Sequence, residues 1–268
     1  MDYITDKAKP NCPSWLNANQ IVACCFCWGT AGSRWLARAL NAHPHQLWVH
    51  APAEANKGRS TAEAVEHTLV WLRRFNNHPV VGLTHGTQIG WYEEIKAHFE
   101  GQGVKFRPFV LVRHPVPRAR SIMALDANNP HRPELDWWQA SAKRAYARLG
   151  DGFFPSEFQD LSFYRAAESM NLAMAEAATG LPIWRIEDLS MCPEALDRLT
   201  WAISDGMLQY PGKLAKEMQD LRIGVHAGGY LQPGEIWLGW PDHWRAAWYK
   251  LIDQDTAQAY EAMGYTLP

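Results

Sequence analysis

The chain has 268 residues, of which 47% are apolar and 20% charged, and its formal net charge is −2. This size and composition predict one soluble domain of enzyme size over 1–268, with an irregular lead-in at 1–18. The near-neutral charge argues against nucleic acid as a partner, because binding its phosphates requires a basic excess. No apolar run approaches the length of a membrane span, so we expect no membrane partner either.

The cysteines indicate the cellular compartment. There are 5 of them, an odd number, and Cys24, Cys25 and Cys27 fall within one apolar run. In such a run they fit as small core residues rather than as metal ligands, and this usage is typical of a reducing compartment. The beginning of the sequence lacks the charged and then apolar pattern of a signal peptide. We therefore expect a cytoplasmic protein without a metal site.

The first predicted elements are a strand at 21–28, a turn with two glycines and a helix from Ser33 to about His43. Gly29 and Gly32 let backbone N–H groups approach an anion, and Ser33 can cap the helix, whose positive end faces the same point. This pattern predicts a phosphate-binding turn. The alternative is that the glycines only permit a tight turn. A Walker A loop is excluded, because its Gly-Lys-Ser/Thr is missing.

Two later stretches end in histidines that are candidates for proton transfer. A short strand pattern over 47–49 is followed by His50 and Glu54, and a predicted strand at 80–84 is followed by His85. A histidine at a strand end can act as a general base, or it can be satisfied by a backbone carbonyl. We expect His85 to be the base, with His43, His45, His50 and Glu54 as alternative base or acceptor-binding candidates.

A second phosphate-binding signal follows the predicted strand at 109–112. That strand ends on Arg113, and a helix predicted over 115–125 carries Ser121 two turns from its start. Arginine offers a planar fork to phosphate oxygens and serine offers a hydroxyl donor, so the pair can hold a second phosphate. The alternative is an ordinary solvated helix start, which leaves the roles of the helix's other arginines open.

The alternation of strands and helices predicts the fold class. Apolar periodicity adds a strand at 181–186 and helices at 61–76, 91–100, 133–149, 156–179 and 193–205. This order predicts an α/β fold of three layers, with a central parallel sheet flanked by helices. Ligands of such sheets bind beyond the carboxyl ends of the strands, where the turn, His85 and Arg113 would lie.

Four elements of the sequence resemble the sulfotransferases that use 3′-phosphoadenosine 5′-phosphosulfate (PAPS). Residues 29–36, Gly-Thr-Ala-Gly-Ser-Arg-Trp-Leu, are similar to the family's 5′-phosphosulfate loop, Pro-(Lys/Arg)-Ser-Gly-Thr-Thr-Trp-Leu. Residues 113–115, Arg-His-Pro, with Ser121 after them look like its Arg-Asp-Pro element and the serine at the same spacing. Residues 184–189, Trp-Arg-Ile-Glu-Asp-Leu, resemble its Tyr-Glu-Asp-Leu strand end. A Trp-Arg helix that closes on Met-Gly-Tyr at 263–265 resembles its C-terminal element. The resemblance covers the chain from about residue 20 to the end.

The resemblance implies a P-loop NTPase-like fold and transfer of a sulfuryl group from PAPS to a hydroxyl or an amine, on a small molecule or a glycan. It further implies that His85 is the general base and that no metal takes part. Arg34 is the basic residue inside the loop and can supply positive charge there; the alternative is that its place in the first helical turn directs it toward solvent or a carboxylate. Trp35 would stack on the adenine, although a tryptophan there could also belong to the core. The implied PAPS-binding residues are Gly29, Thr30, Ala31, Gly32, Ser33, Arg34, Trp35, Arg113 and Ser121.

The sequence also departs from the family's pattern. Thr30 stands where the family has a catalytic Lys or Arg, and Ile186 stands where an aromatic residue commonly lines the adenine pocket. Two alternatives therefore stay open. One is a protein of the same fold that binds PAPS or its product 3′-phosphoadenosine 5′-phosphate (PAP) without catalysis, and the other is a P-loop-related kinase that uses ATP.

Overall fold

The computed structural model describes residues 20–27, 30–50, 78–84, 92–101, 104–129, 131–150, 153, 157–172, 178–225 and 231–268. Several predictions fall outside these residues: the lead-in at 1–18, the helix at 61–76, Gly29, Glu54 and His85.

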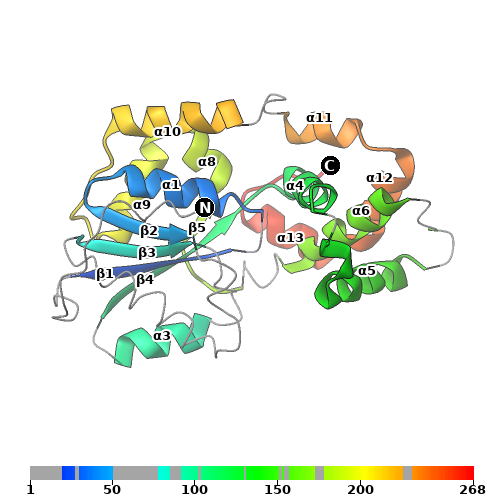
Figure 1. Ribbon diagram of the computed structural model, residues 1–268, viewed down its shortest axis with the longest axis horizontal. Helices are drawn as coiled ribbons and strands as arrows, with labels where there is room; N and C mark the ends of the chain where they lie inside the picture. The colour runs from blue at the N-terminus through cyan, green and yellow to red at the C-terminus, as the bar shows by residue number, and fades with distance from the viewer. Residues whose placement is uncertain are drawn as a thin grey trace. The chain divides into compact units, whose positions relative to one another are not determined.

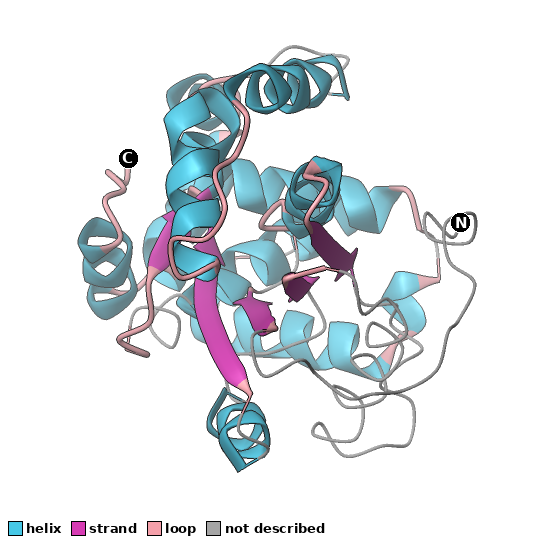
Figure 2. Ribbon diagram, turned by 90° about the vertical axis from the view of Figure 1, so that its left-hand side faces the viewer, coloured by secondary structure: helices cyan, strands magenta, loops and turns pink. Residues whose placement is uncertain are grey.

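The structure contains a five-stranded sheet with the strand order β2-β3-β1-β4-β5. Its strands are β1 (Ile21–Phe26), β2 (Gln46–His50), β3 (Val80–Thr84), β4 (Lys105–Val112) and β5 (Ile183–Arg185). β1 lies between β3 and β4 and is parallel to both, and β2 is parallel to β3. Figure 2 shows the strands in magenta among the helices in cyan. The predicted α/β class with a central parallel sheet flanked by helices is confirmed.

The chain divides into two compact units. Unit 1 holds Met1–Trp28, Gly32–Leu111 and Asp188–Arg222, and unit 2 holds Gly29–Ala31, Val112–Glu187 and Ile223–Pro268.

The core of unit 1 is built on the sheet. All six residues of β1 are buried, as the apolar run predicts for a strand covered on both faces. The helices α1 (Ser33–Ala42) and α9 (Pro193–Ile203) lie over one face of the sheet, and α3 (Tyr92–Gly101) lies over the other (Figure 1). This arrangement gives three layers within unit 1.

One close contact fixes the pairing of two strands in this core. Trp48 on β2 is fully buried and lies opposite Gly82 on β3. A Cβ added to Gly82 would lie only 2.4 Å from the indole of Trp48, well inside van der Waals contact. The indole of Trp48 therefore occupies the space that any larger residue at Gly82 would need.

Unit 2 is mostly helical. Its helices are α4 (Pro115–Ala127), α5 (Asp136–Leu149), α6 (Phe158–Glu168), α11 (Pro233–Leu238), α12 (Asp242–Leu251) and α13 (Gln254–Ala262). A buried ion pair joins two of them, because the Asp126 carboxylate on α4 accepts from Arg165 Nη2 on α6 at 2.6 Å. The same carboxylate oxygen accepts from the Ser162 hydroxyl at 2.7 Å. Pairing and hydrogen bonding together offset the cost of burying these charges.

Several element boundaries differ from the predictions. The helix predicted over 156–179 is shorter, since α6 ends at Glu168 and a short 3₁₀ helix at Ser169–Leu172 follows. The strand predicted over 181–186 is also shorter in the structure, where β5 covers Ile183–Arg185 and α8 (Ile186–Met191) begins directly after it. Helix α10 (Gly212–Val225) was not predicted.

Candidate functional site

The turn after β1 has two residues in the left-handed backbone region. Thr30 has a φ of 67° and Gly32 a φ of 96°. Gly32 is the N-cap of α1, and its carbonyl accepts the first helical hydrogen bond, from Leu36 N, at 3.0 Å. The prediction that Ser33 caps this helix is wrong. Because Gly32 takes the left-handed conformation, Ser33 becomes the first residue inside the helix.

The N-terminus of α1 lies at the carboxyl ends of two strands of unit 1. The buried Ser33 hydroxyl is 3.3 Å from His50 Nε2, at the end of β2. Thr84, at the end of β3, donates from its hydroxyl to the Ser33 carbonyl at 3.1 Å. His50 and Thr84 are register partners in the parallel sheet. The first turn of α1, with its outward N–H groups, therefore lies at the sheet edge where α/β proteins bind ligands.

Two predicted binding residues occupy this first turn. The side chain of Arg34 is exposed to solvent, whereas Trp35 is half-buried. The Trp35 indole Nε1 donates to the Met218 carbonyl of α10 at 3.0 Å. This bond holds the edge of the indole against α10, so the orientation of the ring is fixed within unit 1.

The second predicted site lies in unit 2. Arg113 follows β4 directly and is half-buried. Its Nη1 donates to the Ser121 hydroxyl at 2.8 Å and to the Thr30 carbonyl at 3.0 Å. The structure therefore brings together three residues that the sequence analysis selected from segments far apart in the chain. A hydroxyl that accepts from a guanidinium keeps its own proton for a further acceptor, so Arg113 and Ser121 form a matched pair of donors for an anion.

A hydrogen-bond network supports the backbone next to Arg113. The Glu187 carboxylate accepts from the His114 backbone N–H at 3.0 Å and from the Tyr265 hydroxyl at 2.8 Å. The His114 ring caps α4, because its Nδ1 accepts from Val116 N at 3.2 Å. Its Nε2 lies 3.2 Å from the Thr266 carbonyl. Two segments from later in the chain thus hold the strand-to-helix turn that carries Arg113.

The electrostatics of this network favour neutral rings. Burial lowers the pKa of His114, while the Thr266 carbonyl and the Glu187 carboxylate act in the opposite direction. A neutral imidazole with its proton on Nε2 satisfies both of its hydrogen bonds, donating to Thr266 and accepting from Val116. Burial, followed by the charge of Glu187, raises the pKa of Tyr265. Tyr265 therefore stays protonated and donates to Glu187.

The other residues selected from the sequence are either buried or outside the described part of the chain, except for the exposed His45. Ala31 is fully buried in the turn. Gly29 and the candidate bases His85 and Glu54 lie outside the described residues. His43 is buried, its Nδ1 accepts from His45 N at 3.1 Å and its Nε2 lies 3.1 Å from the Gln209 carbonyl. This histidine has a structural role at the end of α1, whereas the described His50 lies beside Ser33, at the turn that the sequence predicts to bind phosphate.

Sequence reasoning did not select His114, Glu187 or Tyr265 as parts of the site. The motifs at 184–189 and 263–265 contained two of these residues, but only as points of family resemblance. No local signal in the sequence could have found these contacts, because Glu187 is 73 positions from His114 and 78 positions from Tyr265.

The described residues contain neither a cluster of metal ligands nor a helix that could span a membrane. No group of three or more His, Cys, Asp or Glu side chains in the described part of the chain could hold a metal ion. None of the described helices combines the length and the apolar character that crossing a membrane requires.

Comparison of the chain with models of known protein families gave no match, and comparison with curated protein sequences gave none either.

Proposed function

We propose that the protein is a PAPS-dependent sulfotransferase with a P-loop NTPase-like fold. In this proposal the turn from Gly29 to Trp35 binds the 5′-phosphosulfate, and Arg113 and Ser121 bind the 3′-phosphate. The observation that carries it is the contact of Arg113 with Ser121, at 2.8 Å, and with the Thr30 carbonyl of the loop, at 3.0 Å. This contact links the two predicted phosphate-binding elements and supports their assignment to one ligand.

The chemistry assigns a task to each group. An acceptor oxygen or nitrogen attacks the sulfur of PAPS, the bond from sulfur to the bridging phosphate oxygen breaks, and PAP leaves with that electron pair. The acceptor's proton goes to a base, for which His85 is the first candidate and His50 the second. The N–H groups of the first turn of α1 stabilise charge on the departing phosphate, and Arg34 adds a cation in place of the basic residue that Thr30 replaces.

A binding protein of the same fold without catalysis is the second candidate function. The observation that favours it is Thr30 itself, which leaves the loop without its usual basic residue and contributes its carbonyl to Arg113. A kinase is the third candidate. It is disfavoured because the sequence lacks the Walker A lysine that would contact the terminal phosphates of ATP.

Calorimetric titration with PAP, ATP and ADP, each with and without Mg²⁺, tests the proposal. We expect PAP to bind without Mg²⁺ and more tightly than ATP or ADP. Binding of ATP that requires Mg²⁺, without binding of PAP, would overturn the proposal in favour of a kinase. Tight PAP binding with no sulfuryl transfer to any of a panel of phenols, alcohols, amines and sugars would favour the inactive binding protein.

A further inference from the structure

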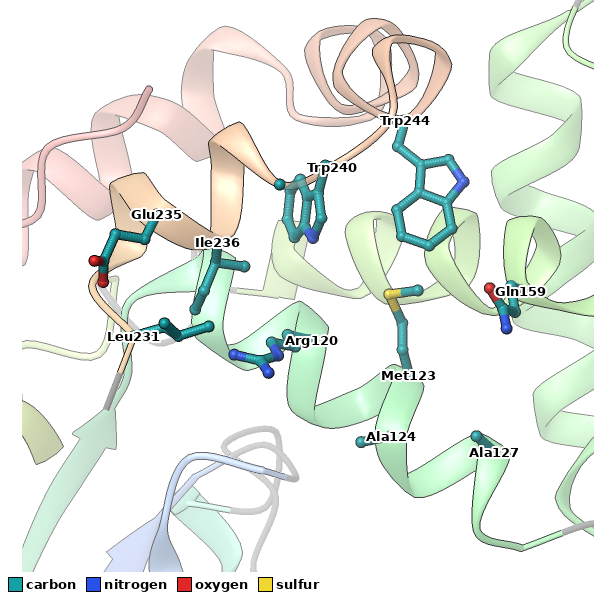
Figure 3. Close-up of a pocket in the computed structure, with 11 residues that line it drawn as sticks. Arg120, Met123, Ala124, Ala127, Gln159, Leu231, Glu235, Ile236, Trp240 and Trp244 are labelled. Atoms are coloured by element: carbon teal, nitrogen blue, oxygen red, sulfur yellow. The ribbon is translucent and has the colours of Figure 1, made fainter. Parts of the chain in front are cut away.

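Unit 2 contains a second concave site. A groove with a volume of about 440 Å³ lies between α4 on one side and α11 and α12 on the other (Figure 3). The α4 side contributes Arg120, Met123 and Ala127, and the opposite side contributes Trp240 and Trp244. A volume of this size falls within the range of small-molecule sites.

Residues of α6 hold the two tryptophans of the groove in place. The Trp244 ring stacks on Phe163, with ring centroids 4.7 Å apart and planes 9° from parallel. Its Nε1 donates to the Asp160 carboxylate at 2.7 Å. Trp240 meets the same phenylalanine edge to face at 4.9 Å. Because both indoles are fixed by these contacts, the wall is formed before any ligand arrives.

Among the described residues that line the groove, Arg120 supplies a cation for an anionic ligand. Arg120 is exposed and lines the groove near Ile236 (Figure 3). The groove also contains Glu235, but this carboxylate accepts from the Gln232 backbone N–H at 2.7 Å as part of the cap of α11. The negative charge of Glu235 is thus compensated by the start of its own helix.

We propose that this groove binds a small, planar aromatic molecule with an acidic group. The aromatic part would pack between the two indoles and the Met123 thioether, which Figure 3 shows pointing toward them, and the acidic group would pair with Arg120. The site is distinct from the proposed PAPS site. Ser121 contacts Arg113, whereas its neighbour Arg120 lines the groove, and consecutive residues of a helix project about 100° apart.

The probe for this site is 1-anilinonaphthalene-8-sulfonate (ANS), with the uncharged N-phenyl-1-naphthylamine as its matched control. We expect ANS to bind the folded protein at one site per chain. Arg120→Gln should lower the ANS affinity about five- to tenfold and leave the affinity for the uncharged probe unchanged, because a partly solvated charge pair is lost. Lys143→Gln, on the exposed face of α5, should change neither.

Filling the groove provides an independent test. Ala124 and Ala127 are exposed on α4 and line the groove, so Ala127→Trp or Ala124→Trp should block both probes while the helical circular dichroism and PAP binding stay unchanged. Binding of ANS that survives in a folded variant of either kind would overturn the proposal. Equal losses of the two probes in Arg120→Gln would also overturn it, since the acidic group would then have no role. Neither outcome bears on PAPS binding, whose test is the PAP titration.

Discussion

Arg113 and Ser121 are joined by a hydrogen bond of 2.8 Å, from Nη1 of the arginine to Oγ of the serine. The arginine follows the last residue of β4, and the serine lies in the second turn of α4. Helix α4 therefore places the Ser121 hydroxyl next to the end of β4, the strand that precedes it in the chain. A guanidinium and a hydroxyl held in this way are already oriented, which would reduce the entropy cost of binding an anion.

We expect Arg113→Ala to weaken PAP binding by roughly 1.5–3 kcal/mol, the size of a charged hydrogen bond left unmade. Ser121→Ala should cost less, because it removes a neutral donor. Adenosine 5′-phosphosulfate has no 3′-phosphate, so its affinity should change far less in Arg113→Ala. Calorimetry with both ligands measures the difference, and Lys143→Ala serves as the control. Equal losses for the two ligands would contradict the assignment of Arg113 to the 3′-phosphate.

Trp35 allows binding and stability to be separated. Trp35→Phe keeps an aromatic face but removes the bond from Nε1 to the Met218 carbonyl. We expect this variant to lose about 1 kcal/mol of unfolding free energy and to retain most of its PAP affinity. Trp35→Ala should lower both the unfolding free energy and the PAP affinity. Urea denaturation and PAP titration measure the two quantities, and a folded Trp35→Ala protein that binds PAP as tightly as the parent would exclude adenine stacking.

The general base is tested by comparing His85→Ala, His50→Ala and Glu54→Gln once an acceptor has been found. Removing a positioned base typically slows the reaction by ~10²–10⁴-fold. We expect a loss of this size in His85→Ala, with PAP affinity nearly unchanged because the base does not touch the nucleotide's phosphates. If His85→Ala keeps full turnover and His50→Ala does not, the histidine that contacts Ser33 is the base.

Acid should destabilise unit 2 through His114. Its pKa lies below the ordinary 6.5 in the folded protein, whereas the unfolded chain has the ordinary value, so the unfolded state binds more protons between these two pKa values. The stabilisation by the neutral ring is therefore complete above pH 6.5 and is lost as the pH falls from there toward the folded pKa.

His114→Asn is the matched variant for this measurement, since asparagine retains a side-chain acceptor for the cap of α4. Unfolding free energies from urea titrations at about pH 7.5 and about pH 5.5 give the pH dependence of each protein. We expect the difference between the two pH values to be smaller in His114→Asn than in the parent. An unchanged difference would show that His114 does not titrate on unfolding.

Gly82→Ala should destabilise unit 1 by about 1–3 kcal/mol, the usual cost of overpacking a core. The new methyl group would meet the Trp48 indole at 2.4 Å, and that ring is fully buried. Gly101→Ala is the control, because a Cβ at Gly101 meets nothing within 4 Å. Thermal unfolding of the two variants gives the comparison, and equal stabilities would contradict the packing argument.

Much of the fold could be predicted from local patterns. β3 has its predicted bounds, and α4 begins at the predicted proline, because a buried parallel strand is a continuous apolar run and proline favours the first helical turn. The early part of β4 was missed. It contains Lys105 and Arg107, whose side chains do not mark a strand, yet the backbone of Lys105 pairs in register with Ile21 of β1.

The contacts of the site that form within one segment of the chain could be predicted from the sequence, whereas the contacts between distant segments could not. The spacing of Arg113 and Ser121 on a strand and its following helix is a local property, and the structure confirms that they meet. The support from Glu187 and Tyr265 depends on residues that are 73 and 78 positions from their partners. A single sequence contains no pattern that pairs such distant residues.

These distant contacts also have a consequence for the order of folding. His114 and the Thr266 carbonyl are separated by 152 positions, and closing so long a loop is slow relative to the formation of a helix. Helix α4 can therefore form early, while the turn before it acquires its final shape only when the segment around Tyr265 has docked. During refolding, the ability to bind an anion at Arg113 should return in the last kinetic phase of unit 2, after its helical signal has recovered.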